Sequence, residues 1–295
     1  MAAWSDGYWW SNDGLRLHYR DYAGDPARPP ILCIPGLTRN ARDFEGVARR
    51  LAGEWRVICV ELRGRGESAY AKNPMSYVPL TYLQDIEALL RELDLKRVVL
   101  FGTSLGGLVA MLLSHAAPGR IAGTLLNDVG PDIDPRGLDR IRSYVGRSQS
   151  WPTWLHAARH FQESQRAIYP KWKLDQWIAF AKRLCRLNAQ GRVVLDYDMR
   201  IAEPLKLPTP AAAFDLWPAF RSLAGAPLLS VRGALSDLLA PQTVERMQSE
   251  AAQMESVAVP AVGHAPTLDE PEAIEATHRL LARIDPPGAS PRDSR

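Results

Sequence analysis

The chain has 295 residues, of which 46% are hydrophobic, and this is enough to form one large core with an inserted subdomain. A net charge of +3 does not indicate a nucleic-acid-binding protein, no window approaches the roughly 18 unbroken apolar residues of a membrane span, and three cysteines, an odd number, argue against a disulfide framework. The first residues lack a basic segment followed by an apolar one, so no secretory signal is predicted and we expect a cytoplasmic protein that binds neither membrane nor nucleic acid.

Strands and helices are predicted to alternate along most of the chain. Half-exposed or fully apolar runs predict strands at 15–20, 31–34, 57–60, 98–101, 123–126, 228–231 and 256–259. Helical patterns fall between them, at about 41–51, 81–93, 105–115, 242–251 and 271–281. This order predicts an α/β protein with a doubly wound, mostly parallel sheet, whose core comprises residues 1–130 and 214–284.

Residues 131–213 interrupt this alternation and have a different charge. They contain 14 Lys+Arg against 8 Asp+Glu, a balance of +6, whereas the rest of the chain has a balance of −3. Helical patterns broken by prolines predict that this segment is an inserted helical cap. The tail at 285–295 is rich in Pro, Ser, Arg and Asp, a composition that predicts disorder.

The segment Gly102-Thr103-Ser104-Leu105-Gly106 lies directly between a predicted strand and a predicted helix. A strand that leads into this motif and a helix that leaves it make a sharp turn, which exposes the serine hydroxyl. A serine nucleophile needs a histidine that takes its proton and a carboxylate that orients the histidine. Asp237 and His264 each follow a later strand, in the order serine, acid, histidine, so we predict Ser104, Asp237 and His264 as the catalytic residues.

The acid and the oxyanion hole each have an alternative interpretation. Asp128 follows the strand at 123–126 and could also reach His264, so it is the alternative acid. The oxyanion hole is expected to use the backbone N–H of Leu105 and that of Leu37, in the loop after the strand at 31–34. Pro35-Gly36 in that loop could instead be a simple turn.

Three other features are interpreted as structural. His156 and His160 share a helix face, but without the glutamate of H-E-x-x-H they indicate a solvated face and not a metal site. The two glycines of the segment 63–66 are interpreted as a turn, since no full nucleotide fingerprint is present. The cysteines are expected to be buried, inert thiols, with Cys33 and Cys59 in strands and Cys185 in a helix.

Together these motifs resemble the α/β-hydrolase superfamily, in its serine-nucleophile branch, over nearly the whole chain. The segment 61–68 is similar to the D-x-R-G-x-G-x-S turn of the family, and 262–271 is similar to its histidine segment. Two departures are that Pro35-Gly36 stands where His-Gly is usual, and Glu61 where Asp is usual. Serine at 104 disfavours the members with an aspartate nucleophile, such as haloalkane dehalogenases and epoxide hydrolases. The resemblance implies a cap inserted after the sixth strand. It implies no metal and no organic cofactor.

The expected function is hydrolysis of a small ester or lactone through an acyl-enzyme, as in carboxylesterases and enol-lactonases. The alternatives are carbon–carbon hydrolysis of a vinylogous diketone from aromatic catabolism, and a catalytically silent ligand-binding receptor. The basic cap favours a small-molecule substrate with a carboxylate, although it could be an ordinary solvated face. Trp151 and Trp154 are candidates for the pocket wall, unless they pack the cap onto the core. We expect a monomer or a homodimer.

Overall fold

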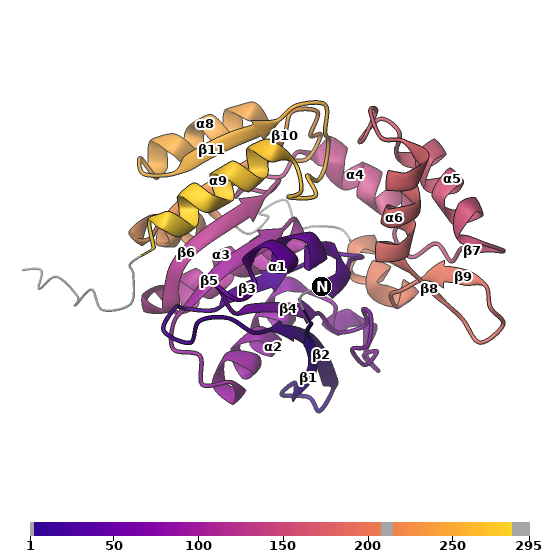
Figure 1. The fold of residues 1–295 in the computed structure, drawn as a ribbon, viewed down its shortest axis with the longest axis horizontal. Helices are drawn as coiled ribbons and strands as arrows, with labels where there is room; N and C mark the ends of the chain where they lie inside the picture. The colour runs from indigo at the N-terminus through magenta and orange to yellow at the C-terminus, as the bar shows by residue number, and fades with distance from the viewer. Residues whose placement is uncertain (1–2, 208–214, 285–295) are drawn as a thin grey trace, which may run out of the picture.

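A computed structural model of the chain describes residues 3–207 and 215–284. Its main element is an eight-stranded sheet with the strand order β1-β2-β4-β3-β5-β6-β10-β11 (Figure 1). The strands are β1 (Ser5–Trp10), β2 (Arg16–Tyr22), β3 (Ile31–Ile34), β4 (Val57–Glu61), β5 (Val98–Thr103), β6 (Ile121–Asn127), β10 (Leu228–Gly233) and β11 (Glu255–Val259). β1 and β2 pair antiparallel, as do β2 and β4, and every pair from β4 to β11 is parallel. The predicted doubly wound, mostly parallel sheet is confirmed.

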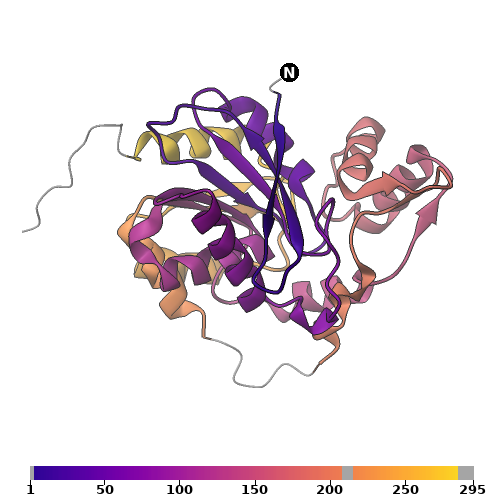
Figure 2. The ribbon, with the colours of Figure 1, turned by 90° about the horizontal axis from the view of Figure 1, so that it is seen from below.

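Helices cover both faces of this sheet, which explains why its central strands are apolar throughout. One face packs against α1 (Glu45–Leu51) and α9 (Pro271–Ala282), and the other against α2 (Pro79–Glu92), α3 (Leu105–Ala116), α7 (Trp217–Arg221) and α8 (Pro241–Glu250). Figure 2 shows helices on both sides of the strands. Along β3 the side chains alternate between the two cores, with Leu32 and Ile34 in one, Ile31 and Cys33 in the other.

The described residues after β6, up to 207, form a separate unit beside the sheet (Figure 1). It contains α4 (Pro135–Tyr144), α5 (Trp154–Gln165), α6 (Leu174–Leu184) and a three-stranded antiparallel sheet of β7 (Ser150–Trp151), β9 (Val193–Leu195) and β8 (Cys185–Leu187). We call this unit, residues 131–207, the cap. It is not purely helical, and its strands were not predicted because runs of two or three residues are too short to produce a periodic pattern. Cys185 begins β8 and is not helical, but it is a buried free thiol, as are Cys33 and Cys59.

Two elements of the structure were not predicted from the sequence, and two of the predicted segments cannot be compared with it. The pattern does not predict β1, an edge strand with mostly exposed side chains, or the short α7. The predicted cap boundary at 213 and the predicted disordered tail at 285–295 lie outside the described residues. Among the described helices, none has the length and apolarity needed to span a bilayer.

The turn after β4 has a structural role, as predicted. Gly64 and Gly66 adopt φ of 77° and 54°, which only glycine adopts at low cost. Arg63 donates to both oxygens of Asp85 on α2, at 2.7 and 2.6 Å, and both side chains are buried. This ion pair fixes the turn beside the carboxyl ends of the parallel strands, the edge of the sheet where Ser104 and His264 also lie.

Candidate active site

Ser104 lies in the sharp turn between β5 and α3. Its φ of 52° and ψ of −118° are a strained combination for a residue with a side chain. The turn requires glycine on both sides, since a Cβ on Gly106 would lie 1.9 Å from the carbonyl oxygen of Ile34 and one on Gly102 would lie 2.6 Å from the carbonyl oxygen of Gly106. The close approach of the backbone thus presents the serine hydroxyl to the cavity under the cap.

A continuous chain of hydrogen bonds joins Ser104 to a buried carboxylate. His264 Nε2 lies 3.0 Å from Ser104 Oγ, and its Nδ1 lies 2.7 Å from Asp128 Oδ2. Asp128 is fully buried and also accepts hydrogen bonds from the N–H of Gly233, at 2.8 Å, and from Ser236 Oγ, at 2.6 Å. These donors hold the carboxylate in place, so the arrangement can orient the imidazole and stabilise its protonated form.

The predicted pairing of Asp237 with His264 is wrong. Asp237 accepts two hydrogen bonds from Arg140 on α4, the longer of them 2.8 Å, and this bonding lowers the pKa of the Asp237 carboxyl. The alternative acid, Asp128, occupies the place beside His264. Both acids follow neighbouring parallel strands, β6 and β10, so the order of residues along the chain does not distinguish them.

The two predicted oxyanion donors come from two different segments, one of which directly follows the nucleophile. Leu105 is the first residue of α3, and Leu37 is in the loop after β3. Within the described residues neither backbone N–H has a protein partner. The buried Arg65 donates from Nε to the carbonyl oxygen of Leu37 at 2.9 Å, which fixes the orientation of that peptide. The sequence did not predict this role for Arg65, because the only feature that marks the residue is its place between the two glycines of the turn.

The cap holds the loop that carries His264 on both sides of the histidine. The N–H of Gly263 donates to the carbonyl oxygen of Ile168 at 2.7 Å, and the Tyr169 hydroxyl donates to the carbonyl oxygen of Ala265 at 2.7 Å. Burial raises the pKa of Tyr169, so its phenol remains protonated and can donate. The cap therefore helps to position the histidine.

On the core side, Asn127 at the end of β6 connects the two catalytic segments. Its Nδ2 donates to Thr103 Oγ1, next to the nucleophile, at 3.1 Å, and to the carbonyl oxygen of Pro266 at 2.9 Å. Asn127 is almost fully buried, so both bonds form in a region shielded from water.

Tyr169→Phe is expected to lower kcat about 3- to 10-fold, because one hydrogen bond of about 1 kcal/mol no longer orients the loop of His264. Steady-state kinetics should show the loss mainly in kcat, with a shift of the acidic limb of the pH profile that follows the histidine. Tyr22→Phe, on β2, is the matched control, because it also removes a buried phenol but lies away from the cavity. Equal kinetics for the two variants would contradict the positioning role of Tyr169.

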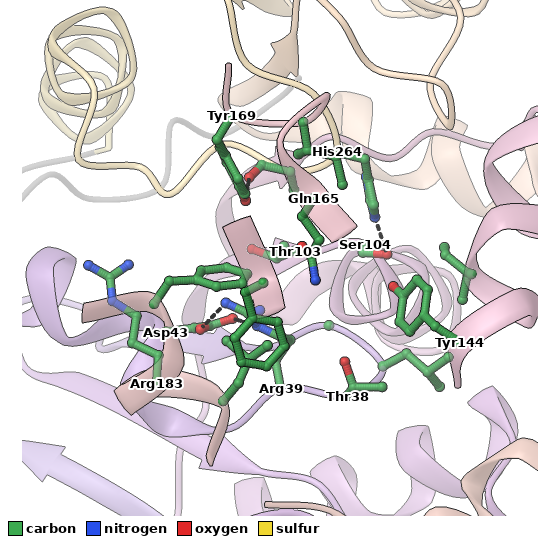
Figure 3. Close-up of a pocket in the computed structure, with 18 of the residues that line it drawn as sticks. Thr38, Arg39, Asp43, Thr103, Ser104, Tyr144, Gln165, Tyr169, Arg183 and His264 are labelled. Carbon is green, nitrogen blue, oxygen red and sulfur yellow. Dashed lines mark hydrogen bonds and ion pairs between the residues drawn. The ribbon is translucent and has the colours of Figure 1, made fainter. Parts of the chain in front are cut away.

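A cavity of about 370 Å³ lies over Ser104 and His264, between the core and the cap. Figure 3 shows Tyr144, Gln165 and Tyr169 of the cap around the cavity, near Ser104 and His264. The aromatic side chains that line it are Phe44, Tyr144, Phe161, Tyr169, Phe180 and Tyr197. The candidates Trp151 and Trp154 are not among the residues that line the cavity, and Trp151 packs against Phe161 inside the cap. The prediction that they wall the pocket is wrong.

His160 also differs from the expectation, because it is half-buried and lines the cavity, whereas His156 is exposed and bonds to Thr153. The described residues contain no group of three or more His, Cys, Asp or Glu that could hold a metal ion. The helix face is therefore partly a wall of the cavity and not simply a solvated surface.

Four arginines line the cavity, and three of them are paired with carboxylates. Arg39 pairs with Asp43, Arg140 with Asp237 and Arg183 with Asp269. Arg147, in the turn after α4, has no side-chain partner among the described residues and is exposed. The positive charge of the cap is thus largely neutralised at the cavity, except at Arg147.

Comparisons with known proteins agree with this geometry. The model of a family described as "Alpha/beta hydrolase family" matches residues 31–277. The 3-hydroxybutyrate-oligomer hydrolase of Cupriavidus necator is 37% identical over 268 residues, which are 88% of this chain and 90% of that protein. The 2-(acetamidomethylene)succinate hydrolase of Mesorhizobium japonicum is 26% identical over 240 residues, 80% of this chain and 81% of that protein. A crystal structure of an alpha/beta hydrolase from Novosphingobium aromaticivorans shares 56% identity with a TM-score of 0.93, and the match covers 96% of this chain and 100% of that one.

Proposed function

Because this chain belongs to the alpha/beta hydrolase family, we propose that it is a serine hydrolase that cleaves a small carboxylic ester through an acyl-enzyme. The observation that carries the proposal is the hydrogen-bonded chain from Ser104 Oγ through His264 to Asp128. This series of hydrogen bonds starts at the Ser104 hydroxyl, which lines a cavity large enough for a small organic substrate, and it ends at the buried carboxylate of Asp128.

In the proposed reaction, Ser104 Oγ attacks the ester carbonyl carbon while His264 Nε2 accepts the hydroxyl proton. Asp128 keeps the Nδ1 proton of His264 in place and stabilises the imidazolium. The N–H groups of Leu37 and Leu105 donate to the carbonyl oxygen as it becomes negative. His264 then gives its proton to the leaving alkoxide, which departs as the alcohol. A water molecule, deprotonated by His264, attacks the acyl-enzyme and releases the acid and Ser104.

The relatives help to choose among the possible esters. The relative from Cupriavidus necator is named for oligomers of a hydroxyacid, which are joined by ester bonds. We propose a linear ester of a short hydroxyacid as the substrate class. The alternative substrates are a lactone and a vinylogous diketone, which would be cleaved between two carbons. The alternative to an enzyme is a catalytically silent receptor.

The direct test combines turnover with labelling of the nucleophile. Purified protein is incubated with p-nitrophenyl butyrate, and nitrophenolate release is followed before and after treatment with a serine-reactive phosphonate. We expect steady hydrolysis, loss of activity on treatment, and the phosphonyl mass on the peptide that contains Ser104. No turnover of any short ester, together with an unlabelled Ser104, would contradict the proposal and favour the receptor. Turnover of a vinylogous diketone in place of esters would favour carbon–carbon hydrolysis.

Arg147 provides a test of the expected preference for anionic substrates. When a terminal ester bond of a hydroxyacid oligomer is cleaved, the free carboxylate is on the alcohol part. An ester with this carboxylate is expected to have about 5- to 10-fold higher kcat/KM at low salt than a neutral isostere, because the Arg147 guanidinium, which has no partner in the described part of the chain, attracts it. The advantage should decrease as ionic strength rises through about 0.1 M, and Arg147→Gln should remove it. Equal kcat/KM for the two esters at every salt concentration would remove the anionic-substrate hypothesis.

A further inference from the structure

An ion pair lines the cavity in the segment between β3 and α1, which also contains Leu37. Arg39 Nε and Nη2 donate to the two oxygens of Asp43 at 2.5 and 2.6 Å, four residues further along the chain. Both side chains line the cavity, yet they are only 20% and 14% exposed. The Arg39 guanidinium also lies 4.7 Å from the centre of the Phe180 ring. Figure 3 shows the pair beside the cavity residues, joined by a dashed line.

The pair lies close to the nucleophile. A Cβ placed on Gly36 would be 3.3 Å from Arg39 Cγ and 3.6 Å from Ser104 Cβ, so the arginine stem and the serine flank the same glycine. The backbone N–H of Arg39 donates to the carbonyl oxygen of Gly36 at 3.1 Å, which ties the residue to the loop of Leu37. The substrate carbonyl must bind at this loop during the proposed reaction. The leaving oxygen of the ester must face His264, because His264 gives it a proton. The acyl part then extends from the carbonyl in the other direction, toward the segment that contains Arg39 and Asp43.

The chemistry of the pair determines what it can recognise. Asp43 uses one lone pair of each oxygen for Arg39, and no other hydrogen bond to its carboxylate exists among the described residues. Nη1 of Arg39 likewise has no protein partner within that part of the chain. The pair therefore offers a free acceptor and a free donor side by side, with no net charge. A hydroxyl group both donates and accepts, whereas a carboxylate only accepts and would be repelled by Asp43.

We propose that the Arg39–Asp43 pair is the subsite for a hydroxyl group on the acyl part of the substrate, so that the protein selects hydroxyacyl esters over plain acyl esters. This inference rests on the proposed ester hydrolysis and specifies its substrate class. An alkyl chain without the hydroxyl would cover the partly desolvated donor and acceptor without bonding to them, and this lowers kcat/KM.

The experiment compares three esters with the same leaving group, p-nitrophenyl 3-hydroxybutyrate, p-nitrophenyl butyrate and mono-p-nitrophenyl succinate. Each kcat/KM is divided by the second-order rate constant for hydroxide-catalysed hydrolysis of that ester, which measures the intrinsic reactivity of its carbonyl. The wild-type protein is expected to favour the hydroxybutyrate over the butyrate at least about 10-fold, and the succinate is expected to be the poorest substrate. In Asp43→Asn the first preference should fall to about 2-fold or less, while the relative rate on the succinate should rise about 10-fold, because Arg39 then lacks its counter-charge.

Glu45→Gln is the matched control, because Glu45 and Arg49 form an ion pair with the same four-residue spacing that does not line the cavity. It should keep all three ratios of the wild type. Circular dichroism and thermal unfolding verify that each variant is folded. If Asp43→Asn does not fold, Arg39→Lys takes its place and should also lower the first preference, because it removes the two-pronged pairing and the free Nη1 donor.

Two results would overturn the inference while leaving the proposed function intact. One is a wild-type protein that hydrolyses butyrate and hydroxybutyrate esters equally well, and the other is a wild-type preference for the succinate. A preference for the hydroxybutyrate that is unchanged in Asp43→Asn would also overturn it, because another part of the cavity would then bind the hydroxyl. Failure of the proposed function itself would appear differently, as no turnover of any of the three esters and no labelling of Ser104.

Discussion

Ser104→Ala is expected to reduce ester turnover by about 10⁴-fold or more, because a nucleophile and its base act as a unit and the loss of one removes the acyl-enzyme route. The hydroxyl contacts His264 and lines the cavity, so its removal takes away little packing. We therefore expect the variant to keep its fold. The measurement is kcat on p-nitrophenyl butyrate, together with thermal unfolding of the same preparation.

The control is Ser249→Ala, which removes a hydroxyl from the exposed end of α8 and should leave kcat unchanged. A Ser104→Ala protein that retains more than about a tenth of the wild-type kcat would exclude this serine as the nucleophile. Loss of activity accompanied by loss of the folded state would not count for the assignment, and Ser104→Cys, a smaller change in shape, would then be tested with the phosphonate.

Asp128→Asn is the second variant with a large expected effect, a loss of about 10⁴-fold in kcat. The amide would present a donor or a neutral acceptor to His264 Nδ1 and would no longer stabilise the imidazolium. The N–H of Gly233 can still donate to the remaining oxygen, which favours a folded protein. The kinetics are measured across pH, since an altered histidine changes the acidic limb as well as the maximum.

Asp237→Asn is the comparison that decides between the two acids. It weakens the ion pair with Arg140, whose side chains are 28% and 35% exposed, and such a pair contributes about 1 kcal/mol or less. We expect a loss of kcat below about 10-fold. Finding Asp237→Asn far more damaging than Asp128→Asn would transfer the catalytic role to Asp237, in agreement with the sequence pattern and against the hydrogen bonds of the structure.

The cap bonds to two loops at the carboxyl edge of the sheet, the loop of His264 and the loop of Asp237. Ile168 and Tyr169 bond to the loop of His264, and α4 provides Arg140 for Asp237. Tyr169, whose hydroxyl supports the histidine loop, also lines the cavity. The positions of the cap and of the histidine are therefore physically linked through hydrogen bonds to the backbone on both sides of His264.

Local patterns in the sequence were sufficient for every strand of the eight-stranded sheet except β1, and for the prediction of Ser104 as the nucleophile. The strands β3, β4 and β5 are continuous apolar runs because both of their faces are covered by helices, so each run identifies a strand without knowledge of its neighbours. Ser104 is identifiable for a similar reason, since its turn requires glycine at 102 and 106 within a few residues of the chain. His264 follows from its position after the last strand of the sheet.

Only the tertiary structure decided between the two acids and determined the pocket wall. Asp128 and Asp237 follow adjacent parallel strands that end at the same edge, so either could reach His264 from its place in the sequence. The choice depends on Arg140, which lies 97 residues before Asp237 and reaches it because α4 packs on the loop after β10. Likewise, tryptophans and phenylalanines have the same hydrophobic pattern along the cap helices. Which of them face the cavity depends on how those helices pack against one another and against the core, and such contacts between distant segments leave no periodic trace in the sequence.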